Sequence, residues 1–402
     1  MRGSPFHPRT VQLCESFQWR NWAGYAIATK YELTHEREYY AIRNAAALLD
    51  ITPLYKYLIQ GPDAARFVDR LITRDVSRCR VGQVMYTTWC NEAGKVIDDG
   101  TVSRLDETTF RITAAEPNWR WFEACAFGLD VTIADISEKV AALALQGPNS
   151  RAILCEVVSG EEKERLERLK FFRVMSATIA GCPVSISRTG YTGDLGFEIW
   201  LDAKDALVIW DCLMEAGAGY GITPTGLLAL DIARIEAGLL LIDVDYTPVR
   251  KALIPEQLSS PFELDLGWTV HLDKRANFVG KRALLAEHER GSRWATVGLE
   301  VDWDDLERAY ARVGLTPQLP HEAWRGSVPL YERGRRQRQV GYATSGTFSP
   351  ILKRYIALGT VEPALAGVGT ELLLEVTIEH VPYRVLARVT KKPFFDPERK
   401  RK

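Results

Sequence analysis

The chain has 402 residues and a net charge of −1 at pH 7, with 46% hydrophobic and 26% charged residues, which is typical of a globular protein. This balance excludes a general electrostatic attraction to nucleic acids or to membrane surfaces, and no apolar run is long enough for a transmembrane helix. Seven scattered cysteines, without a CxxC pair or a His/Cys cluster, argue against a metal site or a disulfide framework and favour reduced thiols in the cytoplasm.

The N-terminal part combines a helical pattern with two similar units. Residues 31–49 carry aromatic or apolar side chains every three or four positions, which predicts one helix. Residues 57–60 predict a strand, a Gly-Pro turn follows, and Asp63 is a candidate N-cap for a helix that ends near residue 71. A second strand, Gly-Pro turn and helix start occur at 144–150, which suggests an internal pseudo-repeat.

A hairpin is predicted at residues 85–102, with Asn-Glu-Ala-Gly at 91–94 as its turn. Its return segment carries Asp98 and Asp99 side by side. Neighbouring residues of a strand point to opposite faces, so one carboxylate faces the interior if the strand continues through them. If the strand instead ends at this point, both carboxylates are solvated, and the residues alone favour that second interpretation.

The most informative stretch is RTGYTGDLGFEIW at residues 188–200. Alternation in 183–187 predicts a strand, three glycines within seven residues predict a loop, and the apolar run at 197–201 predicts a return strand. Period two places Glu198 on the face opposite Phe197 and Ile199. A buried, unpaired carboxylate would be costly, so a buried Glu198 requires a partner in the protein or a ligand. The alternative is a solvated strand face beside a glycine-rich turn.

The remaining elements complete an α+β pattern. Strands at 110–113 and 131–133 flank a helix at 119–127, residues 160–170 predict a solvated helix, and a further helix is expected at 203–217. The helix that begins at residue 227 has an apolar face that Arg234 and Glu236 interrupt.

Beyond a predicted linker at 286–294, the chain is rich in expected strands, which lie at 296–301, 328–331, 340–344, 372–378 and 381–389. Residues 302–327 are interpreted as an insertion, and the basic tail at 399–402 as disordered.

Three of these stretches resemble the motifs of one family. RTGYTGDLGFE at 188–198, NEAGKVIDD at 91–99 and ALDIARIEAG at 229–238 are similar to phrases of the folate-binding aminomethyltransferases, which comprise the glycine cleavage T-protein and its relatives. The resemblance runs in order from about residue 19 to residue 395. It implies an α+β, three-domain cloverleaf, in which two α+β folate-binding domains, 1–53 with 140–248 and 54–139 with 249–285, are joined by a C-terminal β-barrel at 292–397.

The resemblance also implies a tetrahydrofolate-dependent enzyme with four site residues. Asp99, rather than Asp98, would orient the pterin and stabilise positive charge at its N5 atom. Glu198 would accept hydrogen bonds from the pyrimidine ring, and Tyr191 would pack on the pterin or hydrogen-bond near it. Arg234 would pair with a carboxylate of the folate tail or hold the site acids, with a surface or salt-bridge arginine as the alternative. No metal is required.

The one-carbon donor stays open. Thr52-Pro53-Leu54-Tyr55 stands where the family has Ser-His-Met-Gly, in a segment that lines the substrate side in relatives. Together with residues 302–327, this departure favours a stand-alone demethylase that takes a methyl or methylene group from a small methylated substrate. The alternatives are an aminomethyltransferase that acts on a lipoyl carrier protein, and a non-enzymatic iron–sulfur maturation factor. The lack of a cysteine in 188–194 argues against the last. The aromatic residues of 17–40 are interpreted as core packing, with a cation-binding box for a methylated onium group as the alternative.

Overall fold

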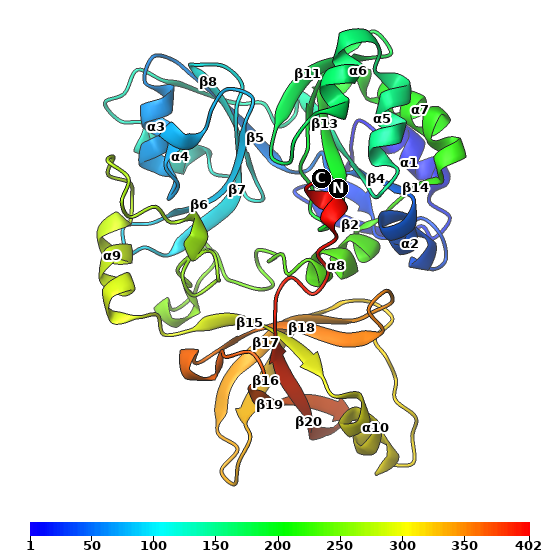
Figure 1. Ribbon diagram of the computed structural model, residues 1–402, viewed down its shortest axis with the longest axis vertical. Coiled ribbons are helices and arrows are strands. Elements are labelled where there is room, and N and C mark those ends of the chain that lie inside the picture. Colours follow the sequence, from blue (N-terminus) through cyan, green and yellow to red (C-terminus); the bar gives the residue numbers. More distant parts are fainter.

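Two open sheets and one closed barrel organise the chain, and the computed structural model describes all residues from 1 to 402. Figure 1 shows the two sheets side by side above the barrel. A small N-terminal sheet orders β1 (Arg2–Gly3), β3 (Tyr25–Ala28) and β2 (Trp19–Trp22), with α1 (His7–Leu13) inserted after β1.

The larger open sheet has the strand order β11-β12-β13-β10-β4-β14. Its strands are Val174–Ile179, Cys182–Ser187, Gly196–Asp202, Val140–Gln146, Ala46–Asp50 and Ile222–Pro224 in that order. One face packs on α5 (Ser150–Val157), α6 (Gly160–Glu167) and α7 (Ala206–Gly217) in a core of 25 buried residues. The opposite face meets α2 (Glu36–Asn44) and α8 (Leu227–Glu236).

The second open sheet has the order β6-β7-β8-β5-β9. Its strands are Val84–Cys90, Val96–Arg104, Thr109–Ala114, Tyr55–Gln60 and Thr132–Asp135, and α3 (Ala64–Leu71) and α4 (Trp119–Cys125) cover one face. Phe110, Ile112 and Ala114 of β8 belong to that covered core, so the alternate residues Arg111 and Thr113 face away from the helices.

The inner faces of the two open sheets meet through a cation–π contact. On β13, Phe197 and Ile199 lie in the core under α5 and α7, so Glu198 and Trp200 face the other way, as the alternation predicted. The Arg111 guanidinium lies 4.3 Å from the centre of the Trp200 ring. Arg111 of one sheet and Glu198 of the other therefore lie on the faces that meet.

The C-terminal strands close into a barrel with the order β15-β18-β17-β16-β19-β20 around a separate apolar core. The strands are Ala295–Val301, Arg354–Val361, Gln339–Ser349, Trp324–Glu332, Glu371–Ile378 and Val381–Thr390; α9 (Lys281–Arg290) precedes them and α10 (Trp303–Ala311) follows β15. The predicted α+β class with a C-terminal barrel is confirmed, whereas the exact domain boundaries stay a prediction. None of the helices combines the length and apolar character that a membrane span requires.

Several local predictions are wrong, each because tertiary contacts outweigh the local pattern. The helix expected at 31–49 ends at Asn44, since residues 46–50 pair with β10 and β14 as the fully buried strand β4. Asp63 is the N-cap residue of α3 as predicted, but its carboxylate forms no capping hydrogen bond and accepts from the backbone N–H of Asp130 instead, at 3.0 Å.

Four further corrections concern the C-terminal third. The expected linker at 286–294 is largely the end of α9, where Leu284 and Glu287 are buried. Strand β18 was not predicted. The insertion at 302–327 contains α10 and the beginning of β16. The tail is ordered against the central hairpin, because Arg399 forms an ion pair with Asp194 at 2.6 Å.

Candidate active site

Asp99 lies on the inner face of β7 between two tyrosine hydroxyls. Tyr86 of β6 donates to Oδ2 at 2.8 Å, and Tyr246, from the loop after α8, donates to Oδ1. Burial raises the pKa of Asp99, while the two hydroxyl donors oppose that rise. Burial and the Asp99 charge raise the pKa of both tyrosines, so these hydroxyls stay protonated and act as fixed donors.

Asp98 occupies the opposite face and has a different environment. Its fully buried carboxylate accepts from the Asn118 side chain at 2.8 Å and from the backbone N–H groups of Glu116 and Asp99 at 3.0 and 2.8 Å. Burial, followed by the neighbouring Asp99 charge, raises the pKa of Asp98 well above its ordinary range. The protein itself pairs this carboxylate, which is the arrangement of a structural group.

The two hairpin residues lie at different points of the interior. The half-buried Tyr191 donates to the Leu240 carbonyl, and burial raises its pKa. The charge of Arg234 opposes that rise, whereas the charge of Asp99 adds to it. Glu198 accepts from the Thr189 hydroxyl at 2.7 Å, and burial raises its pKa while Thr189 and Arg111 oppose the rise.

Arg234 is buried, and the two aspartates that it binds connect α8 to the barrel. Its Nε donates to Asp231 at 2.8 Å and its Nη1 to Asp245, whereas Nη2 has no hydrogen-bond partner. Asp231 also binds Arg325 of β16 at 2.7 Å, and Asp245 accepts from the Ser345 hydroxyl of β17 at 2.7 Å. The acids that Arg234 binds are Asp231 and Asp245 and not Asp99 or Glu198, so these contacts match the alternative of a salt-bridge arginine, and both predicted site roles stay predictions.

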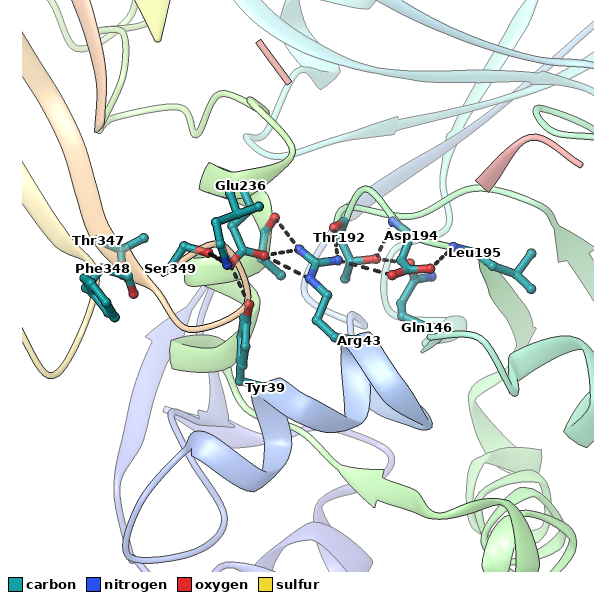
Figure 2. A network of polar contacts seen from close by, with 12 residues as sticks. Tyr39, Arg43, Gln146, Thr192, Asp194, Leu195, Glu236, Thr347, Phe348 and Ser349 are labelled. Carbon is teal, nitrogen blue, oxygen red and sulfur yellow. Dashed lines mark hydrogen bonds and ion pairs between the residues drawn. The ribbon is translucent and has the colours of Figure 1, made fainter. Parts of the chain in front are cut away.

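A second buried network fixes the loop that carries Tyr191 (Figure 2). Glu236, fully buried on α8, accepts from Arg43 at 2.6 Å and from the hydroxyls of Tyr39 and Ser349 at 2.5 Å each. Arg43 also donates to the Thr192 carbonyl of the hairpin loop at 2.9 Å. The loop is therefore tied to α2, α8 and the barrel at once, which explains why Glu236 interrupts an apolar helix face.

The structure brings Asp99, Tyr191 and Arg234 into one neighbourhood and places Glu198 beside Arg111. Sequence reasoning missed Tyr86, Tyr246 and Arg111. Tyr246 has no local signal, because it meets Asp99 from 147 residues away. Arg111 did carry a signal in the sequence. It is a charged residue between the apolar strand residues Phe110 and Ile112, just as Glu198 lies between Phe197 and Ile199.

A separate cavity of about 450 Å³ lies beside the N-terminal sheet. Thr52, Pro53 and Tyr55 line it, together with residues that include Arg2 and Tyr25. None of the four predicted site residues lines this cavity, so its volume alone does not mark the reaction centre. No group of three or more His, Cys, Asp or Glu side chains is arranged to hold a metal ion.

Comparisons with known proteins agree with this architecture. Residues 9–274 match the family model described as the GCVT N-terminal domain, and residues 311–396 match the glycine cleavage T-protein C-terminal barrel domain. An aminomethyltransferase of Caldanaerobacter subterraneus is 34% identical over 372 residues, which cover 91% of this chain and 89% of that protein.

Two further matches extend the comparison. A trimethylamine-oxide aldolase of Ruegeria pomeroyi is 34% identical over 406 residues, covering 98% of this chain but 47% of that longer protein. The crystal structure of the glycine cleavage system aminomethyltransferase T from Bartonella henselae superposes with a TM-score of 0.82 over 98% of both chains, at 26% identity.

Proposed function

Because the chain belongs to the glycine cleavage T-protein family of aminomethyltransferases, we propose that it is a tetrahydrofolate-dependent one-carbon transferase. In this proposal it acts as a demethylase that moves a methyl or methylene group from a small methylated substrate to N5 of tetrahydrofolate. The observation that carries the proposal is Asp99, an enclosed carboxylate held by Tyr86 and Tyr246 on the shared inner face.

Several buried polar atoms of the protein are available to a polar ligand. Arg111 Nε, Thr113 Oγ1 and Arg234 Nη2 are buried polar atoms without a hydrogen-bond partner. Each such group costs about 1–3 kcal/mol while it stays unpaired, so a ligand that pairs it is favoured. We assign Glu198, Tyr191 and Arg234 to holding tetrahydrofolate, in the roles that the motif resemblance implies.

Asp99 supplies the chemistry that the chain itself contributes. When bound, tetrahydrofolate offers N5, an amine that accepts the one-carbon unit. A carboxylate nearby stabilises positive charge at such a nitrogen or takes up its proton. Tyr86 and Tyr246 each donate to one oxygen of Asp99, which fixes the carboxylate and leaves further lone pairs for a ligand N–H.

Two observations support a small methylated donor. The relative named trimethylamine-oxide aldolase aligns with 98% of this chain at the same 34% identity as the aminomethyltransferases. Arg325, from the segment read as an insertion, also reaches Asp231, which holds Arg234 of the proposed folate site. The second candidate is transfer from a lipoyl carrier protein, which the aminomethyltransferase relatives and the Bartonella henselae structure favour.

A turnover screen with tetrahydrofolate separates the two candidates. The donors are trimethylamine N-oxide, methylated amines, betaines, sulfonium compounds, methoxy-aromatics and an aminomethyl-lipoyl carrier protein, with Asp99→Asn as the inactive control. Formation of 5-methyl- or 5,10-methylene-tetrahydrofolate from a free small molecule supports the demethylase. Methylene product with ammonia release from the carrier alone establishes the second candidate. Folate binding without any product contradicts both.

A further inference from the structure

Arg111 is a buried cation whose side chain forms no hydrogen bond within the protein. It lies on β8 in the middle of the five-stranded sheet, and only 5% of its surface is exposed. Its Nε has no hydrogen-bond partner, and burial lowers its pKa to about 10 while the charge of Glu198 opposes that fall. The Arg111 charge in turn lowers the pKa of Lys56. A buried charge without a hydrogen-bonded partner is costly, so this arginine is retained at the expense of folding stability.

The polar atoms around Arg111 are under-satisfied as well. Thr113, two residues further along the same face, has a buried hydroxyl without a partner. Glu198 faces Arg111 from β13 with Thr189 as the side-chain donor to its carboxylate. The unpartnered polar atoms of Arg111 and Thr113, together with the Glu198 carboxylate, therefore form a polar site for a ligand.

This site is continuous with the reaction centre at Asp99. Arg111 pairs with Ser103 of β7 and Thr113 pairs with Thr101, so Asp99 lies on the same face two register steps away. Asp99 and Ser103, the strand partner of Arg111, are four residues apart, which corresponds to about 13 Å along the strand. A ligand on this face therefore meets Asp99 toward one end and the Arg111–Glu198 pair toward the other.

The pair selects a particular ligand chemistry. Arginine only donates hydrogen bonds and a carboxylate only accepts them, and the two charges sum to zero. An anion would be repelled by Glu198 and a cation by Arg111, so the complement is a neutral edge with N–H donors beside a carbonyl acceptor. The 2-amino-4-oxo pyrimidine edge of a pterin has this arrangement.

We propose that Arg111 reads the 4-oxo group of the pterin, donating to its carbonyl oxygen while Glu198 accepts from the adjacent N–H groups. Arg111 is then a specificity-determining residue that distinguishes 4-oxo from 4-amino pterins. This inference rests on the proposed function, because it presumes that a folate occupies the inner face.

The test compares two stable ligands by titration calorimetry: 5-formyltetrahydrofolate and its 4-amino-4-deoxy analogue. The wild-type protein should bind the 4-oxo compound at least 100-fold more tightly, because the exchange removes a charge-assisted hydrogen bond and sets N–H groups against the guanidinium. Arg111→Met should lower affinity for the 4-oxo compound about 10- to 100-fold and bring the ratio below about ten. Arg66→Met, at an exposed site on α3, is the matched control and should leave both affinities unchanged.

Thermal unfolding supplies a readout that a structural role would lower. Arg111→Met keeps the packing volume beside Trp200 and removes a buried guanidinium without a hydrogen bond, but it also removes the charge that opposes the burial of Glu198, so its melting temperature should stay close to that of the wild type. A lower melting temperature with an unchanged affinity ratio overturns the inference and makes Arg111 structural.

The remaining outcomes separate this inference from the proposed function. If Arg111→Met weakens both ligands equally, the residue does not read the 4-oxo group. If it raises only the KM of the one-carbon donor, Arg111 binds the donor instead, and the inference is again overturned. If the wild-type protein binds neither folate, the proposed function itself fails.

Discussion

In the Asp99→Asn variant, a neutral amide takes the place of the carboxylate between Tyr86 and Tyr246. The amide has nearly the same size, so the packing of β7 should not change. It has one oxygen where the carboxylate has two, so one tyrosine hydroxyl has to turn from donor to acceptor. The substitution therefore removes the charge at the site and preserves its shape.

The expected loss of turnover is about 10²- to 10⁴-fold, the usual contribution of a positioned acid or base. At about 1.36 kcal/mol for each factor of ten, this corresponds to roughly 3–5 kcal/mol of transition-state stabilisation. Binding of 5-formyltetrahydrofolate should change by less than about tenfold, or 1.4 kcal/mol, because Glu198, Tyr191 and Arg234 are the residues assigned to holding the folate.

Folding stability should change little at neutral pH. Two hydrogen bonds to a charged acceptor weaken from about 1.5–3 to about 0.5–1.5 kcal/mol each, but the cost of a buried charge disappears. Because burial raises the pKa of Asp99 in the folded protein, the wild type loses stability as pH rises from the ordinary value of 3.8 through the folded value. The variant lacks this loss.

The assay is single-turnover formation of the folate product, with calorimetry and urea unfolding on the same preparations. Asp106→Asn, an exposed aspartate in the loop between β7 and β8, serves as the control. Turnover within about threefold of the wild type, at saturating tetrahydrofolate and with binding retained, would remove Asp99 from the mechanism.

Three further predictions concern the groups around this centre. In Tyr246→Phe, loss of a donor that lowers the pKa of Asp99 should move the acidic limb of the pH–rate profile to higher pH; an unchanged limb contradicts the assignment. Glu198→Gln should weaken 5-formyltetrahydrofolate binding about 10- to 100-fold by calorimetry, and equal affinity would exclude the contact. Arg43→Met leaves Glu236 buried without its cation, so the free energy of unfolding should fall by about 3–5 kcal/mol in a urea titration. A fall below about 1 kcal/mol would show that the remaining hydroxyl donors suffice.

Local pattern was a good guide wherever the physical signal is itself local. Two-residue alternation identified β12 and β13 and placed Glu198 opposite Phe197 and Ile199, because successive side chains of a strand point to opposite faces. The same reasoning failed at residues 46–50. Their spacing continues a helical pattern, but pairing with β10 and β14 makes them a strand.

The sequence by itself determined the family, the α+β class, the C-terminal barrel and the types of residue available for chemistry. These features can be recognised from the sequence because motifs and alternation depend on residues that are close together in the chain. Only the tertiary structure decided which of those residues meet. Tyr246 reaches Asp99 across 147 positions and Arg43 reaches Glu236 across 193. Contacts of this kind depend on how separate sheets and helices pack. The sequence around each side chain does not indicate which distant residue it will contact. For that reason Asp98 and Asp99 looked alike in the sequence, although they lie on opposite faces of β7 and have different surroundings.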